Sequence, residues 1–254
     1  MLGKALTTAA AGNAAGEATY VEDVFSTYLY EGNDYVKHID NGIALSDANY
    51  GESVLFDGTG DYLSVGTDAS FGFGTGDFTM ECWIHPLSVP TTYKGLISTL
   101  GSSPAVGVSL CTDGSGNITF SLNSASGGVF TANSTGQKYS ANVWQHLAIT
   151  RESGTVKIWL DGSQIGTDKT ATGDCGTTDD AVVGRLKTQI DNYYFDGYIS
   201  NSRIVKGTAV YTSAFTPSTT PLTAISGTSL LTCQGTTIED ASSNAHTITV
   251  VGDA

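Results

Sequence analysis

The chain has 254 residues, a formal net charge of −14 and only 14% charged side chains. An acidic surface repels phosphate backbones and anionic lipid headgroups, so we expect neither a nucleic acid nor a membrane as a partner. The composition of 31 glycines, few prolines and 40% hydrophobic residues indicates short strands joined by tight turns around a packed core. It therefore predicts an all-β protein.

The four cysteines show no motif. No two of them form a C-x-x-C pair, no histidine cluster lies beside them, and their spacing gives no disulfide framework; they are Cys82, Cys111, Cys175 and Cys233. Zinc binding is therefore not expected. Free thiols in a reducing compartment are the favoured interpretation.

The first segment, residues 1–18, is rich in alanine and glycine and has no large core residue after Leu6. Polar residues interrupt its alanine run, which argues against a signal peptide. Two interpretations stay open: an arm that lies on its own domain, or a peg that docks on a partner protein. We favour the peg, with assembly contacts from Met1, Leu2, Lys4 and Leu6.

The second segment, residues 19–48, is predicted to be a β-hairpin. Val24–Tyr30 is rich in strand formers, Glu31–Asp34 gives a turn, and Tyr35–Ile39 returns. Because an isolated hairpin is marginal in water, it must pack on the main domain or on a neighbour.

The remainder, residues 49–254, repeats short strands between turn signals. Phe78–Ile84 alternates with period two, and Trp144–Arg151 with Thr155–Leu160 forms the strongest hairpin. Val210–Phe215 is expected to be a short turn or a single helical turn. Roughly a dozen such strands predict an antiparallel two-sheet β-sandwich.

Four segments, in their order along the chain, carry a family resemblance: Ser53–Val65, Asp77–Pro86, Trp144–Thr167 and Val183–Gly207. They resemble the laminin-G-like, pentraxin-like branch of the concanavalin A-like jelly rolls. This resemblance implies a curved two-sheet sandwich, in which Trp83, Trp144 and Trp159 occupy framework positions. It does not by itself imply a function.

Three other segments, Tyr20–Asn33, Gly207–Cys233 and Gln234–Ala254, resemble structural proteins of tailed, especially marine, bacteriophages. That resemblance implies a virion component, such as a tail-fibre, appendage or capsid-surface protein, assembled in the host cytoplasm. Other virion proteins would be its partners, and we expect a homo-oligomer.

The last segment departs from the family pattern. In many laminin-G-like domains a segment like Asp240–Asn244 precedes the strand of the FDG motif, whereas here it comes last. Either the sandwich is circularly permuted or a further domain is cut short, and we favour permutation. Thr247–Val251 should then lie near Ser53–Phe56, and pairing within the chain is favoured over donation to a neighbouring subunit.

Aromatic residues suggest a glycan site. Tyr193 and Tyr194, with contributions from Tyr139 and Tyr93, could stack on a pyranose ring, while ordinary strand packing is the alternative.

Asp57 and Asp240 on turns suggest a structural calcium ion, and the alternative is that each caps its turn. The pentraxin calcium site is not expected, because Arg185–Thr188 replaces its acidic run. No cofactor is required by any of these interpretations.

Catalysis is not expected. Hydrolytic members of the family show an E-x-D-x-x-E pattern that this sequence lacks, and Glu81 is predicted to lie alone on a solvated face. The histidines fall on separate strands and are interpreted as packed or exposed strand residues rather than bases; they are His38, His85, His146 and His246. Three hypotheses remain, in this order: a virion structural protein, a free lectin module, and a glycan-cleaving enzyme.

Overall fold

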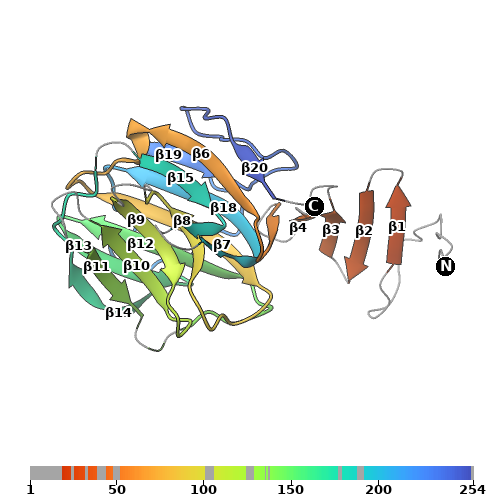
Figure 1. Cartoon of the computed structure of the whole chain (residues 1–254), viewed down its shortest axis with the longest axis horizontal. Coiled ribbons are helices and arrows are strands. Elements are labelled where there is room, and N and C mark those ends of the chain that lie inside the picture. Colours follow the sequence, from red (N-terminus) through yellow and green to blue (C-terminus); the bar gives the residue numbers. More distant parts are fainter. Residues whose placement is uncertain are drawn as a thin grey trace.

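Strands are the main regular structure, and they form an antiparallel two-sheet sandwich with a small separate sheet beside it (Figure 1). The computed structural model describes residues 52–100, 106–123, 129–134, 136, 138–176, 179–187 and 192–252, and the strands between residues 19 and 47. The predicted all-β sandwich is confirmed. Within these residues no helix is long and apolar enough to cross a membrane.

The back sheet has the order β14-β13-β12-β7-β18-β19, and β5 pairs with the same edge of β18 as β19. Its strands are β14 (Ser163–Thr170), β13 (Thr155–Leu160), β12 (Gln145–Glu152), β7 (Phe78–Pro86), β18 (Asp196–Lys206), β19 (Thr228–Thr232) and β5 (Val54–Asp57).

The front sheet has the order β11-β10-β9-β8-β15-β6-β20. Its strands are β11 (Val129–Asn133), β10 (Ile118–Asn123), β9 (Gly107–Thr112), β8 (Lys94–Ser98), β15 (Asp179–Val183), β6 (Tyr62–Asp68) and β20 (Thr249–Val251). A short 3-10 helix, η1 (Ala69–Phe71), follows β6.

A further hairpin, β16 (Arg185–Lys187) and β17 (Asn192–Tyr194), lies against β8. A Cβ on Gly95 of β8 would come within 1.8 Å of the Leu186 backbone nitrogen, so a glycine is needed where this hairpin crosses.

The core lies between the sheets and follows the period-two pattern of the strands. In β7, the inward side chains Phe78, Met80, Cys82 and Ile84 have no exposed surface. Each fully buried side chain of this size stabilises the fold by about 2 kcal/mol. All four cysteines are free, as predicted, and the structure shows that all four are buried.

The separate sheet is a four-stranded meander of β1 (Thr19–Asp23), β2 (Ser26–Glu31), β3 (Asp34–His38) and β4 (Ala44–Asp47). The predicted hairpin corresponds to β2 and β3, and the structure adds a strand on each side. Residues 1–18 lie outside the described residues. The docking peg, with Met1, Leu2, Lys4 and Leu6, and the boundaries after residues 18 and 48 therefore stay predictions.

The last strand, β20, pairs with β6 of its own chain, with Thr249 opposite Ser64 and Val251 opposite Tyr62. Pairing within the chain was expected, but the expected neighbour, Ser53–Phe56, was wrong. That segment forms β5 and pairs with β18 in the back sheet. The free edge of β6 accepts β20 instead, and Val250 packs against the core there.

Asp240 anchors the segment that leads to β20. Its carboxylate accepts hydrogen bonds from the backbone N–H groups of Leu231 (3.1 Å), Ser242 (2.9 Å) and His246 (3.0 Å), and it contacts the His246 ring nitrogen Nδ1 at 2.7 Å. Burial alone would raise the pKa of Asp240, but these bonds outweigh it and lower the pKa. The carboxylate is therefore a structural anion.

We predict that Asp240→Asn lowers the free energy of unfolding at pH 7 by about 2 kcal/mol, because bonds to a charged acceptor are lost. A carboxylate whose pKa is lower in the folded state stabilises the fold at pH values above its unfolded-state pKa. This stabilisation is lost as the pH falls. The difference from wild type should therefore shrink below about pH 4. Urea unfolding across pH measures it. Glu239→Gln, at the exposed neighbouring carboxylate, is the control; an equal loss in both variants would contradict the assignment.

Candidate functional site

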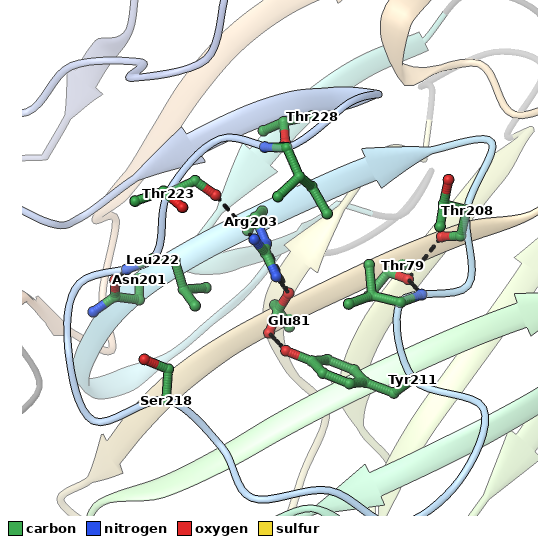
Figure 2. Close-up of polar contacts among 12 residues, drawn as sticks. Thr79, Glu81, Asn201, Arg203, Thr208, Tyr211, Ser218, Leu222, Thr223 and Thr228 are labelled. Carbon is green, nitrogen blue, oxygen red and sulfur yellow. Dashed lines mark hydrogen bonds and ion pairs between the residues drawn. The ribbon is translucent and has the colours of Figure 1, made fainter.

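A strap of residues 207–227 leaves the end of β18, crosses the outward face of the back sheet and returns as β19. Figure 2 shows its path over β7 and β18. Side chains of three strands of the back sheet donate hydrogen bonds to backbone carbonyl groups of the strap. These bonds are Thr79 Oγ1 to Thr208 (2.9 Å), Lys157 Nζ to Thr212 (2.9 Å), Trp83 Nε1 to Ser218 (3.0 Å) and Arg203 Nη1 to Thr223 (3.0 Å). The strap therefore covers the middle of this face.

A buried carboxylate lies beneath the strap. Glu81 Oε1 accepts from Arg203 Nη2 (2.6 Å) and Nε (2.8 Å), while Oε2 accepts from the Tyr211 hydroxyl (2.6 Å) and contacts His146 Nε2 (3.0 Å). Burial alone would raise the pKa of Glu81, but the bond and charge of His146, the Arg203 charge and the Tyr211 hydroxyl lower it. Burial and the Glu81 charge raise the pKa of Tyr211.

The predicted solvated position of Glu81 is wrong, because the side chain has no exposed surface. Period two places Glu81 on the outward face, as expected, but the strap takes the place of water there. Arg203 faces it only because β18 shifts register between Ser200 and Arg203 against β7.

Aromatic rings of the strap pack against the sheet. Phe215 stacks on Tyr211 with ring centroids 3.6 Å apart, and its ring lies edge-on to His146 (5.6 Å) and Trp159 (5.7 Å). Gly162 has φ +76°, and a Cβ there would come within 1.8 Å of the Phe215 carbonyl oxygen. Val210–Phe215 therefore forms bends held by the sheet and no helical turn.

Beyond the strap contacts, an aromatic row crosses the back sheet. It consists of His85 in β7, Trp144 just before β12, and Tyr198 in β18. The His85 ring centroid lies 5.4 Å from that of Trp144 and 5.8 Å from that of Tyr198. All three side chains are half-buried. Burial raises the pKa of Tyr198, so its hydroxyl keeps its proton at neutral pH.

Aliphatic side chains extend the aromatic row. Leu55 of β5 lies opposite Tyr198, while Leu87 and Val143 are 43% and 50% exposed on the adjoining loops. His85 and Tyr198 come from paired antiparallel strands, and Trp144 directly precedes β12, which also pairs with β7, so the backbone ladder fixes where the rings lie. The result is a partly exposed surface of aromatic and aliphatic side chains.

The tyrosines predicted from the sequence do not form one patch. Tyr193 and Tyr194 are adjacent in β17 and so face opposite sides of that hairpin. Tyr193 lies 5.4 Å from exposed Tyr93, and Tyr194 lies 6.3 Å from Tyr62. Tyr139 as a stacking residue is wrong, because it is 2% exposed and belongs to the core.

The two predicted calcium ligands lie at opposite ends of β6. Asp57 donates its backbone N–H to Asp61, just before β6, whereas Asp240 binds His246, whose Nε2 is 3.7 Å from Asp68 at the other end. A shared site at Asp57 and Asp240 is therefore wrong. Each caps a turn instead, since Asp57 Oδ1 accepts the N–H of Thr59 at 2.6 Å. The described residues contain no cluster of three acidic, histidine or cysteine side chains suited to a metal.

The structure also places the histidines and tryptophans. His146 is buried under the strap, His246 lies against Asp240, and the side chain of His38 lies outside the described residues. Trp83 and Trp159 are buried framework residues, as the resemblance implied, whereas Trp144, which it also placed in the framework, is only half-buried. The sequence analysis missed the aromatic row, although outward alternation in β7 already marks His85.

The sequence matches the model of the concanavalin A-like lectin/glucanases superfamily over residues 57–214. That is more than half of the chain. The chain therefore belongs to this superfamily. None of the curated proteins compared with it matches.

Solved structures share the fold at low identity. A putative carbohydrate-binding protein from Bacteroides ovatus is 14% identical, with a TM-score of 0.56 over 95% of this chain and 70% of that one. Domain 4 of AbnA, a GH43 extracellular arabinanase from Geobacillus stearothermophilus, solved with arabinotriose, is 20% identical, with a TM-score of 0.51 over 66% and 77%. Domains LG4-5 of mouse laminin alpha1 are 17% identical, with a TM-score of 0.48 over 65% and 44%.

We predict that Glu81→Gln lowers the free energy of unfolding by about 3–5 kcal/mol, because Arg203 is left as a buried charge without its carboxylate. Amide hydrogen exchange should then accelerate in the strap more than in β9 and β10. Tyr211→Phe removes one hydrogen bond and is the milder matched variant, with about 1–2 kcal/mol expected. Unchanged exchange in the strap of Glu81→Gln would contradict the anchoring role.

Proposed function

We propose that this protein is a non-catalytic glycan-binding module that holds a sugar on the aromatic row of the back sheet. The observation that carries the proposal is the row of His85 in β7, Tyr198 in β18 and Trp144 just before β12, whose rings are partly exposed and lie beyond the strap contacts. No cofactor is needed for this mode of binding.

Aromatic rings suit sugars because the C–H face of a pyranose or furanose is apolar while its rim carries hydroxyls. The ring of Trp144 provides the largest flat area, and the Tyr198 hydroxyl can exchange hydrogen bonds with the rim. Rings held on strands lose little conformational entropy on binding. The aromatic row therefore offers both stacking and orientation.

The superfamily and its relatives support a binding role. The arabinanase domain that shares the fold was solved with arabinotriose, and the Bacteroides ovatus protein is described as a putative carbohydrate-binding protein. Against hydrolysis stands the environment of Glu81, whose two oxygens are already taken by Arg203, Tyr211 and His146 beneath the strap.

We predict that a neutral oligosaccharide chosen from a glycan array changes the tryptophan fluorescence of the protein. Of the three tryptophans only Trp144 is half-exposed, because Trp83 and Trp159 are buried beneath the strap. Trp144→Phe should abolish the change, and Tyr198→Ala should weaken the affinity roughly tenfold, which is about 1.4 kcal/mol. Thermal unfolding checks that each variant is folded.

Variants on the β16–β17 hairpin serve as matched controls. Tyr193→Ala and Tyr194→Ala remove the tyrosines predicted from the sequence and should leave the affinity unchanged. Loss of binding in these two variants, with Tyr198→Ala unaffected, would move the site to that hairpin. An array on which the wild type binds nothing would contradict the glycan-binding function itself.

We further propose that the module serves in a bacteriophage virion, as a tail-fibre, appendage or capsid-surface protein that can contact host glycans. The support is the resemblance of Tyr20–Asn33, Gly207–Cys233 and Gln234–Ala254 to phage structural proteins. Its expected partners are other virion proteins, reached through residues 1–18, and further copies of itself. Mass spectrometry of purified virions should detect the chain, and its absence from them would contradict this role.

A further inference from the structure

Two aspartates stand beside the aromatic row. Asp196 of β18 lies directly opposite Asp57 of β5, and Tyr198 lies directly opposite Leu55 in the same pair of strands. Residues opposite each other share a face, and residues two apart along a strand share it as well. Both aspartates therefore lie on the outward face, about 7 Å along the strands from Tyr198 and Leu55.

The hydrogen-bond partners that both aspartate carboxylates have among the described residues carry no charge. Asp196 Oδ2 contacts the Ser88 hydroxyl at 3.3 Å, and Asp57 Oδ1 accepts the N–H of Thr59. Ser88 and Thr59 are both uncharged. The net charge of −14 makes the electrostatic potential around both aspartates more negative.

We propose that the aromatic row selects neutral glycans and rejects glycans that carry carboxylates, such as those with sialic or uronic acid. The proposal rests on the glycan-binding function and names the ligand class of that site. A sugar carboxylate seated on the row would meet two aspartate charges within about 7–10 Å, a range over which like charges at a protein surface repel at low salt. A neutral sugar hydroxyl can instead donate a hydrogen bond to either aspartate.

The test compares matched pairs of glycans that differ only in a terminal sialic acid, printed on one array and then titrated by calorimetry. We expect wild type to bind the neutral member at least about tenfold more tightly at low salt. Salt screens charges that are a Debye length apart, so the ratio should fall at high ionic strength. Asp57→Asn with Asp196→Asn should bring the ratio close to one while the neutral member keeps its affinity within about threefold.

A matched double variant controls for net charge. Glu152→Gln with Asp168→Asn removes two exposed charges, one at the end of β12 and one in β14. Both strands lie toward the edge of the back sheet that is opposite β5 and β18. It should keep the wild-type ratio.

Three results would overturn the proposal. Equal binding of both members by wild type would remove the selectivity while leaving the glycan-binding function intact. If the affinity ratio is unchanged in the Asp57→Asn, Asp196→Asn variant, the selectivity comes from other groups. Binding of neither member would reject the glycan-binding function together with its selectivity.

Discussion

The closed surface of the back sheet depends on one buried charge cluster, in which Glu81 joins Arg203, His146 and Tyr211. An arginine enclosed in protein needs a carboxylate nearby, and that carboxylate in turn needs its remaining lone pairs filled. The strap supplies the last donor through Tyr211 and excludes water with Phe215. Strap and sheet are therefore two halves of one packed unit, and a ligand cannot reach the middle of this face.

The strap also determines which part of the back sheet stays uncovered. It crosses β7, β12 and β13 and returns over β18, so the aromatic row at the far ends of these strands stays partly exposed. Around the row, Leu87 and Val143 add apolar area, and Asp57 and Asp196 add negative charge. A site of this kind is built by leaving part of a sheet open rather than by adding a loop.

The sequence predicted what period two and turn chemistry control, namely the strands and the sandwich, and the family resemblance implied the framework role of Trp83 and Trp159. It could not predict what lies on the outward face, because a strap without regular structure has no periodicity. Glu81 was therefore placed in solvent, and the register shift that turns Arg203 toward it depends on an irregularity in β18. Tyr139 was misplaced for the same reason, since its loop packs into the core. Asp57 and Asp240 were correctly assigned to turns, but only the fold shows that β6 separates them.

The central claim is that the strap closes the back sheet and leaves the aromatic row as the ligand surface. A titration followed by amide and aromatic NMR, with the neutral oligosaccharide that binds best, tests it most directly. We expect shifts at His85, Trp144 and Tyr198, with Tyr93, Tyr193 and the strap residue Phe215 unmoved. Shifts confined to Tyr93 and Tyr193, or spread along the strap, would contradict it.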